Sequence, residues 1–502
     1  MRPKTDLRLL AFDLGAESGR AMVGFFDGQH ISLEEIYRFA NRPVRVGEHL
    51  YTDVLNLWAE MQTGLQKAVA HSGDSLASMG VDTWGVDFAL LDGQDQLLGN
   101  PFHYRDPHTR GMLAEAAKRA PLEYIYSQTG NQLMEFNTLF QLLALQREGH
   151  SSLNSARSLL MLPDLFNYWL SGQKASEYTI ASTSQCFDPN QRSWAVELLG
   201  RLGLPAEIFQ TIVPAGTMLG RLQPWLAEQS GCGAIPVVAP ACHDTGSAVA
   251  AVPVSLPNFM YISSGTWSLV GVELEQPLIN AATRAANLAN EGGVGGWTRL
   301  LKITPGMWLL QQCKIEWSRR GHSYSYDELT SLGAAAPAFG PLLAVSDSDF
   351  LAPGDMPARI QAYLHRTDQR PLQSEGEIVR CILESLALEY RACLNGYESL
   401  LGWPLQAIHI IGGGSRNRLL NQITADVTRR PAIAGPVEAT VVGNVLVQAM
   451  GLGELASLEQ LRQVVRDSFD PLVFDPHPDD RWEEAYQRYL QLAARTGGVG
   501  TK

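Results

Sequence analysis

Hydrophobic and polar positions near the N-terminus follow two regular patterns. Leu7 to Asp13 is an apolar run and Ala21 to Phe26 is another, with a short polar turn between them. This arrangement predicts a β-hairpin. From Val54 to Val69 apolar side chains recur at helical spacing, which predicts an amphipathic helix, and a strand follows near Met79 to Asp82. The N-terminal part of the chain is therefore expected to be α/β.

The pattern of strand, turn and strand recurs in the second half. Phe259 to Ile262 and Trp267 to Val272 are apolar runs on either side of a turn of small polar residues. A helix over Glu377 to Leu401, a strand over Ala407 to Ile411 and a helix from Arg416 are expected after it. The repetition indicates an internally duplicated chain.

The length predicts two domains. A chain of 502 residues exceeds the size at which one hydrophobic core keeps growing. Pro253 and Pro257 mark a plausible crossing between the halves. We therefore expect an N-terminal domain over 1–253, a C-terminal domain over 254–455, and an extension over 456–502 that carries no recognisable motif.

Composition and charge narrow the range of partners. The chain is 45% hydrophobic and 18% charged, as ordinary globular proteins are, and its net charge of −13 would repel a nucleic acid backbone. No segment reaches the length of a membrane span. The six cysteines form no CxxC pair and read as reduced thiols. We expect a cytoplasmic protein that binds small molecules, with no nucleic acid or membrane partner, as a monomer or small homo-oligomer.

Two matched turns are candidates for phosphate binding. Backbone N–H groups approach a phosphate closely only where residues are small. In the turn from Gly15 to Arg20, Ser18 and Arg20 could reach phosphate oxygens, and the strand-end Asp13 could hold Mg²⁺ through water. Ser263 to Thr266 offers hydroxyls and a glycine in the corresponding place. Ordinary hairpin turns are the alternative, although the duplication favours phosphate binding.

A third glycine turn is a candidate adenosine platform. Gly412, Gly413 and Gly414 stand between an apolar strand and a helix, so a nucleoside could lie on bare backbone. The spacing is not the G-x-G-x-x-G dinucleotide fingerprint, and the sequence has no Gly-Lys pair and hence no P-loop.

Asp244 is the candidate general base. It follows the apolar run Ile235 to Ala239, at a strand-to-helix turn of the kind where α/β folds expose reacting groups. The alternative is that Asp244 caps a helix over Thr245 to Val252, and the two roles can coexist.

A sugar surface is suggested by Trp84, Gly85 and Asp87, which combine a flat ring, an open backbone and a polar anchor. A buried tryptophan corner followed by a turn is the alternative. His243 could bind a sugar hydroxyl or could be a structural histidine.

These residues as a set resemble the FGGY carbohydrate kinases, over about Leu9 to Leu455. The stretches that carry the resemblance are FDLGAESGR from Phe12, DTWGVDF from Asp82, YRD from Tyr104, FNTLFQL from Phe136, EYTIASTSQ from Glu177, CHDTGSA from Cys242, SSGTWSL from Ser263, NEGG from Asn290 and GPVEAT from Gly435. Together they are specific, whereas each alone is not.

The resemblance implies a two-domain actin/hexokinase-like (ribonuclease H-like) α/β ATPase fold with an interdomain cleft. It also implies ATP- and Mg²⁺-dependent conversion of L-rhamnulose to L-rhamnulose 1-phosphate in L-rhamnose breakdown, with Asp244 as proton acceptor. The resemblance also implies which residues contact the substrates. ATP would contact Ala16, Glu17, Ser18, Gly19, Arg20, Thr266, Gln311 and Gly413. The sugar would contact Gly85, His243, Asp244 and Thr245.

One position departs from the L-rhamnulose-specific pattern. Ile303 stands where an asparagine that contacts substrate is typical, and its apolar side chain cannot replace those hydrogen bonds. Either Thr304 or a water takes over, or the preferred sugar differs, L-fuculose being the nearest alternative. An alternative from another class is a non-catalytic nucleotide-dependent sugar sensor.

Overall fold

The computed structural model describes residues 7–72, 76–254 and 256–496, so the ends of the predicted intervals 1–253 and 456–502 lie outside the described residues. The chain divides into two compact units. The first consists of Met1–Pro253, Glu273–Leu301 and Ala439–Phe469, and the second of Val254–Val272, Lys302–Glu438 and Asp470–Lys502. Segments from late in the sequence therefore belong to the first unit.

The first unit is built on a six-stranded sheet with the order β13-β14-β6-β1-β2-β3. Its strands are β1 (Leu7–Leu14), β2 (Ser18–Phe26), β3 (Ile31–Ala40), β6 (Leu76–Thr83), β13 (Thr217–Arg221) and β14 (Pro236–Ala239). β1 pairs antiparallel with β2 and parallel with β6. The predicted N-terminal hairpin and the strand after the first helix are thus confirmed.

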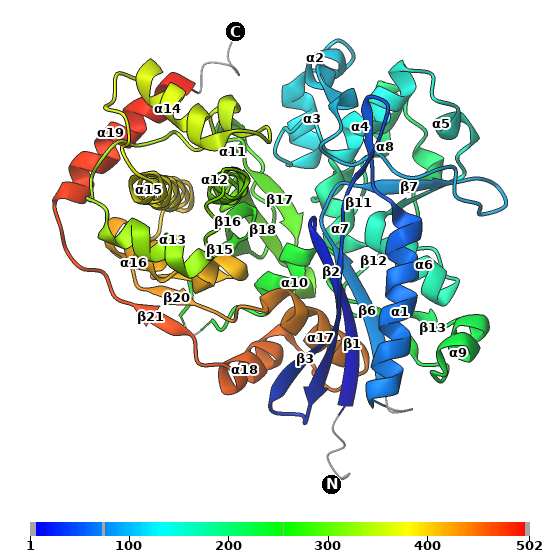
Figure 1. Cartoon of the computed structure of the whole chain (residues 1–502). Coiled ribbons are helices and arrows are strands. Elements are labelled where there is room, and N and C mark those ends of the chain that lie inside the picture. The colour runs from blue at the N-terminus through cyan, green and yellow to red at the C-terminus, as the bar shows by residue number, and fades with distance from the viewer. Residues whose placement is uncertain (1–6, 73–75, 255, 497–502) are drawn as a thin grey trace. The chain divides into compact units, whose positions relative to one another are not determined.

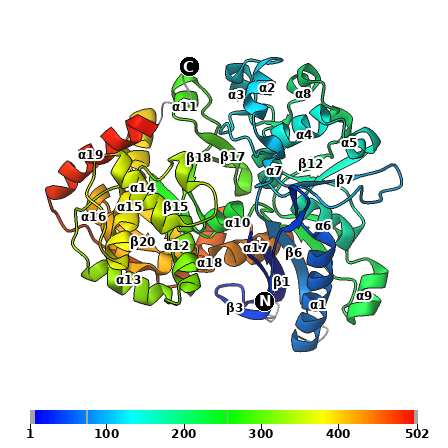
Figure 2. The same ribbon diagram turned by 45° about the horizontal axis from the view of Figure 1, so that its top comes forward.

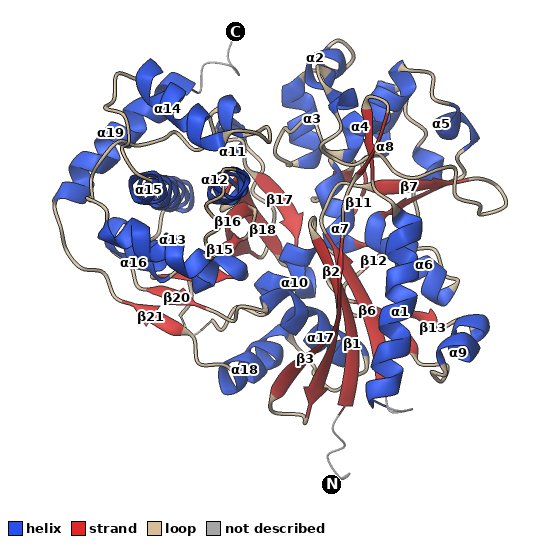
Figure 3. Ribbon diagram, in the orientation of Figure 1, coloured by secondary structure: helices blue, strands red, loops and turns tan. Residues whose placement is uncertain are grey.

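Side chains of β1 alternate between the two faces of the sheet, and different helices cover these faces (Figures 1 and 3). Leu10, Phe12 and Leu14 enter a core with apolar residues of α1 (Val54–Ser72) and α6 (Leu162–Ser171). The opposite face is covered by α17 (Ala439–Gly451), which packs on β1 and β6. Successive side chains of a strand point to opposite faces, so Asp13 lies on the face that α17 covers.

The second unit repeats this strand arrangement. Its strands are β15 (Phe259–Ser264), β16 (Trp267–Leu274), β19 (Ala407–Ile411), β20 (Ala432–Ala434) and β21 (Leu472–Phe474), in the order β16-β15-β19-β20-β21. β15 is antiparallel to β16 and parallel to β19, β20 is parallel to β19, and β21 is antiparallel to β20. The row β2-β1-β6-β14-β13 has the same sequence of pairings. The predicted duplication is therefore visible in strand topology.

The glycine turn after β19 delays the next helix. The long helix α15 (Glu375–Leu401) and β19 form as predicted. A short 3₁₀ turn occupies Gly413–Arg416, and α16 runs over Arg418–Thr428. The predicted start at Arg416 is wrong because the Asn417 side chain accepts the Leu420 N–H at 3.0 Å and so caps the helix.

Regular elements also form after Leu455, where the sequence offers no motif. They are α18 (Leu458–Ser468) in the first unit, and β21 and α19 (Arg481–Thr496) in the second. In Figure 2, α19 packs along α15 and α16. Among the described residues, no helix has the length and apolar character needed to cross a membrane.

Candidate functional site

Two neighbouring strands of the first unit each present a carboxylate. Asp13 near the end of β1 and Asp82 near the end of β6 are direct partners in the parallel register, so both side chains emerge on the same face. Arg20, opposite Asp13 in the hairpin, donates to Asp13 Oδ2. The hairpin and β6 thus bring a guanidinium and two carboxylates together at the same end of the sheet.

Asp82 is held by a chain of buried polar groups from α17. Asn444 Nδ2 donates to Asp82 Oδ2, Gln448 Nε2 donates to Asn444 Oδ1 at 2.7 Å, and Ser78 Oγ donates to Gln448 Oε1 at 2.7 Å. Burial raises the pKa of Asp82 well above its usual range, and the nearby charge of Asp13 adds to that rise. Oδ1 of Asp82 is buried without a hydrogen-bond partner among the described residues.

Asp244 stands at the first position of α10 (Asp244–Ala250), where β14 has ended. The cap residue of this helix is His243 and not Asp244, so the capping alternative is wrong in detail. Thr245 Oγ1 donates to Asp244 Oδ1 at 3.0 Å, and the Asp244 side chain is 31% exposed. Burial raises the pKa of Asp244, His243 opposes the rise, and the charge of Asp13 adds to it.

His243 lies between Asp244 and a buried ion pair. Its Nε2 is 3.4 Å from Asp244 Oδ1, and its Nδ1 is 3.2 Å from Glu291 Oε2 and 3.1 Å from Arg299 Nη2. Arg299 Nη2 is also 3.0 Å from Glu291 Oε2. Glu291 is buried, yet His243 and Arg299 overcome the effect of burial and hold its pKa below the usual value.

The backbone at Cys242 and His243 is fixed by a further buried carboxylate. Glu177 Oε2 accepts the Cys242 N–H at 3.0 Å and the Thr179 hydroxyl at 2.6 Å, and Thr179 Oγ1 accepts the His243 N–H at 3.1 Å. Burial raises the pKa of Glu177 to about 7. The stretch EYTIASTSQ therefore supports the turn that carries Asp244.

Gly85 lies in the loop after β6, close to Thr183. A Cβ at Gly85 would come within 3.1 Å of Thr183 Oγ1, so a side chain there would require Thr183 to shift. Asp87 is not a surface anchor: it is fully buried and accepts from Trp84 Nε1 at 3.0 Å. The buried tryptophan corner is thus the correct interpretation of Trp84 and Asp87, and a sugar contact at Gly85 stays a prediction.

The first turn needs its glycines for close packing and not for a positive φ. Neither Gly15 nor Gly19 has positive φ. A Cβ at Gly19 would lie 2.3 Å from the ring of Phe39, so close packing excludes a side chain there. The turn itself is closed by the Gly15 N–H, which donates to Ser18 O at 2.9 Å.

The second unit brings together the three predicted nucleotide residues that lie in it. Thr266 is in the β15–β16 turn, and its carbonyl accepts from Gly306 N at 3.1 Å and Trp308 N at 3.2 Å. These bonds fix the start of α12 (Trp308–Arg319), whose first turns carry Gln311. Gln311 Oε1 is buried without a hydrogen-bond partner among the described residues, which leaves an acceptor for a ligand.

The three glycines after β19 differ in what they allow. Gly412 has φ +81°, which glycine accommodates without strain. A Cβ at Gly414 would lie 2.0 Å from Ser264 Oγ, so this glycine joins the turn to β15. A Cβ at Gly413 would meet nothing within 4 Å. Gly413 is therefore the one of the three with an open face.

Thr304 does not take over from the asparagine expected at Ile303. Thr304 is fully buried, and its hydroxyl lies 3.3 Å from Ser346 Oγ. Adjacent residues of the strand β18 (Thr298–Pro305) point to opposite faces, so Thr304 and Ile303 cannot present groups to the same ligand.

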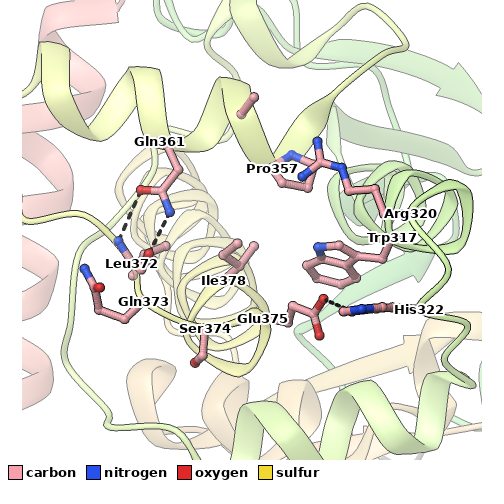
Figure 4. Close-up of a pocket in the computed structure, with 11 residues that line it drawn as sticks. Trp317, Arg320, His322, Pro357, Gln361, Leu372, Gln373, Ser374, Glu375 and Ile378 are labelled. Atoms are coloured by element: carbon pink, nitrogen blue, oxygen red, sulfur yellow. Dashed lines mark hydrogen bonds and ion pairs between the residues drawn. The ribbon is translucent and has the colours of Figure 1, made fainter.

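A separate pocket of about 580 Å³ opens in the second unit (Figure 4). Trp317, Arg320 and His322 line one side of it, with Glu375 next to His322, and Gln361 lies on the other side. His322 Nδ1 is 3.1 Å from Glu375 Oε1. None of the predicted site residues lines this pocket.

Three residues of the first unit's site received no role from sequence reasoning: Asp82, Glu291 and Arg299. Asp82 and Glu291 fall within the stretches DTWGVDF and NEGG, which were informative only as a resemblance. Arg299 carries no local signal, since its role depends on pairing across β17 (Ala289–Gly292) and β18.

Comparison with known proteins gives two domain matches. The C-terminal domain of the FGGY family of carbohydrate kinases matches residues 260–452, and the N-terminal domain of that family matches 8–251. The rhamnulokinase of Bacteroides thetaiotaomicron is 46% identical over 476 residues, covering 95% of this chain and 97% of that protein. The rhamnulokinase of Klebsiella pneumoniae (strain 342) is 41% identical over 472 residues, covering 94% and 95%.

Solved structures match the fold. A xylulose kinase from Rhodospirillum rubrum aligns with TM-score 0.79 at 18% identity over 97% of this chain and 98% of that one. Plasmodium falciparum glycerol kinase with ADP aligns with TM-score 0.77 at 14% identity over 98% of each chain. The fold expected from the sequence, that of the two-domain kinases, is confirmed.

Proposed function

The chain belongs to the FGGY family of carbohydrate kinases and is an ATP-dependent sugar kinase, and from this premise we propose that it phosphorylates L-rhamnulose with Asp244 as general base. The product is L-rhamnulose 1-phosphate, an intermediate of L-rhamnose breakdown. The observation that carries the proposal is the 46% identity to a rhamnulokinase over nearly the whole chain. The position of Asp244 at the N-terminus of α10, beside His243, supports its part in the chemistry.

The chemical step needs a proton acceptor at the attacking hydroxyl. Asp244 takes the proton of the sugar hydroxyl as its oxygen bonds to the γ-phosphorus, and the bond from that phosphorus to the bridging oxygen breaks to release ADP. A partly exposed carboxylate with a raised pKa suits this task, since it stays a stronger base than an ordinary surface aspartate.

ATP binding is assigned to the residues carried over from the family resemblance. In the first unit these are the turn residues Ala16 to Arg20, whose N–H groups and guanidinium suit phosphate oxygens. In the second unit they are Thr266, Gln311 and Gly413. The unused Gln311 Oε1 and the open face of Gly413 support their assignment to adenosine.

The family implies Mg²⁺, which neutralises phosphate charge when bound. Within the described residues no group of three or more His, Cys, Asp or Glu side chains could hold a metal ion directly. Asp13 and Asp82 are side by side, and Asp82 Oδ1 lacks a partner among the described residues. These residues fit an ion that Asp13 holds through water, with Asp82 beside it.

The sugar contacts are assigned to Gly85, His243, Asp244 and Thr245. Ile303 argues against L-rhamnulose as the preferred sugar. Its side chain cannot form the hydrogen bonds of an asparagine, and Thr304 does not supply them instead. A related ketose such as L-fuculose is therefore the second candidate substrate, with the same base and the same nucleotide.

The variant Asp244→Asn tests the catalytic assignment. It keeps the shape and removes the proton acceptor, so ATP-dependent formation of sugar phosphate should fall about 10²- to 10⁴-fold. ATP affinity, measured by calorimetry, should stay unchanged.

Asp188→Asn is the matched control. Asp188 is a buried turn aspartate of the same unit that accepts the Asn190 and Gln191 N–H groups at 2.9 and 3.2 Å. Its variant should keep wild-type turnover. Near-normal turnover by Asp244→Asn would remove Asp244 from the mechanism.

A further inference from the structure

We propose that the buried Glu291–Arg299 ion pair positions Asp244 for catalysis, acting through His243; this inference rests on the proposed function of Asp244. Glu291 and Arg299 face each other across the antiparallel strands β17 and β18. Their side chains are 3% and 0% exposed. They do not touch the reacting atoms in this scheme, so they are positioning residues.

Two groups lie beside His243 Nδ1. Arg299 Nη2, which can only donate, lies 3.1 Å from it, and Glu291 Oε2, which can only accept, lies 3.2 Å from it and also accepts from that Nη2 at 3.0 Å. In this arrangement Nδ1 accepts from Arg299, which already pairs with Glu291, and the ring proton is on Nε2. Nε2 lies 3.4 Å from Asp244 Oδ1, an oxygen of the proposed base.

Arg299 is itself held from two sides. Its Nε donates to Gly292 O at 2.8 Å, and its Nη2 donates to Glu291 Oε2 at 3.0 Å. The planar guanidinium makes these bonds in a fixed orientation, so Nη2 has little freedom relative to His243. Glu291 thus supplies both the counter-charge and the orientation.

A purely structural purpose explains this pair poorly. A buried ion pair is often no more stabilising than apolar residues of the same volume, because both charges lose their hydration. A pair that fixes the tautomer of His243 orients a polar group, which apolar residues of the same volume cannot do.

This arrangement gives the two carboxylate oxygens of Asp244 different roles. The hydroxyl of Thr245 donates to Oδ1 at 3.0 Å, and His243 Nε2 lies 3.4 Å from the same oxygen. We therefore assign the acceptance of the sugar proton to Oδ2. A carboxylate whose one oxygen is held presents the other in a defined direction, and misplacement by about 1 Å can cost 10²-fold in rate.

The test compares Glu291→Gln with Glu273→Gln. The first keeps the side-chain shape and removes the charge that orients Arg299. The second breaks another buried ion pair of the first unit, Glu273 with Arg462 at 2.5 Å, whose side chains are 6% and 8% exposed. Neither residue of that pair has a role in the site.

We expect Glu291→Gln to lower kcat about tenfold to a hundredfold, with the KM for ATP changed by less than about twofold. Glu273→Gln should leave kcat unchanged even if its Tm falls by a similar amount. Adding His243→Asn to Glu291→Gln should lower kcat no further than His243→Asn alone, since the pair acts through His243. Additive losses in this cycle would overturn the inference.

Nitrogen NMR of histidine-labelled protein gives a readout that needs no activity, with the His243 signal assigned by loss in His243→Asn. We expect the Nε2-protonated pattern in the wild type and a changed pattern in Glu291→Gln. If Glu291→Gln does not fold, Arg299→Lys takes its place. That variant keeps the positive charge and removes the planar guanidinium. A protonated Nδ1 in the wild type would overturn the inference.

The two proposals fail in different ways. Wild-type protein without kinase activity on any ketose would contradict the proposed function, and the NMR comparison would still decide the tautomer. Active wild-type protein with normal kcat in Glu291→Gln would contradict the positioning role and leave the proposed function intact.

Discussion

At the scale of single residues, Asp244 combines partial exposure with a raised pKa. Its side chain is 31% exposed, so a hydroxyl can reach it, while burial of its surroundings and the charge of Asp13 disfavour the ionised form. His243 partly offsets this effect. The balance leaves a carboxylate that binds protons more tightly than an ordinary aspartate.

This balance predicts the acid side of the pH profile. The base works only when ionised, so activity should fall as pH decreases through the pKa of Asp244. Because that pKa is raised, the fall should occur above pH 3.8, the ordinary value for aspartate. A profile of kcat/KM against pH measures it. An acid limb at or below the ordinary value would contradict the assignment.

Gln311 allows binding to be separated from stability. Its Oε1 makes no hydrogen bond within the described residues, so Gln311→Ala should leave the Tm unchanged. If Gln311 binds adenosine, the KM for ATP should rise about three- to tenfold.

The neighbouring Gln312 is the matched control for this variant. Gln312 Oε1 accepts the Gly354 N–H at 3.3 Å and so holds the loop before α14 (Met356–Arg366). Gln312→Ala should lower the Tm and leave the KM for ATP unchanged. Equal KM values in both variants would remove Gln311 from the nucleotide site.

At the scale of elements, the close contact of α10 and α17 holds the start of α10 near the sheet. A Cβ at Gly443 in α17 would lie 1.8 Å from the carbonyl oxygen of Ser247 in α10. Such a contact requires one helix to move. The same α17 holds Asp82 through Asn444, so a shift would reach both carboxylates.

Gly443→Ala should therefore destabilise the protein by about 1–3 kcal/mol, although alanine favours a helix. Chemical denaturation measures the free energy of unfolding, and kcat should fall as well because α10 begins at Asp244.

Gly396→Ala in α15 should change the free energy of unfolding in the opposite direction to Gly443→Ala. A Cβ there would meet nothing within 4 Å, so the substitution should stabilise the protein by about 0.5–1 kcal/mol. Equal stability changes in both variants would contradict the packing argument.

The elements that local pattern governs could be predicted from the sequence. The hairpin β1–β2, the helix α1 and the strand β19 form where apolar runs and helical spacing place them. The start of α16 does not follow from the apolar pattern, because the Asn417 side chain caps the helix.

The candidate site could be predicted only in part. The structure places Asp13, Asp244 and His243 in one unit, where Asp13 and His243 both influence the pKa of Asp244. Arg299 escaped prediction because nothing in its own neighbourhood of the sequence marks it; only the register of β17 and β18 brings it to Glu291.

At the scale of the whole molecule, one strand arrangement occurs twice and carries different side chains each time. The hairpin β1–β2 and its neighbour β6 carry the carboxylates and the guanidinium of the first unit. The hairpin β15–β16 and its neighbour β19 carry the turns with Thr266 and Gly413. Duplication followed by divergence of side chains explains how similar backbones come to carry such different side chains in the two units.

The reaction proposed for this protein is phosphoryl transfer from ATP to L-rhamnulose. The most direct measurement is a coupled ADP-release assay with Mg-ATP over L-rhamnulose, L-fuculose, D-xylulose and L-ribulose, ranked by kcat/KM. We predict the highest kcat/KM for L-rhamnulose, which would show that Ile303 is tolerated. A higher value for another ketose would contradict the substrate assignment, and no sugar-stimulated ADP release with any ketose would contradict the proposed phosphorylation of a ketose.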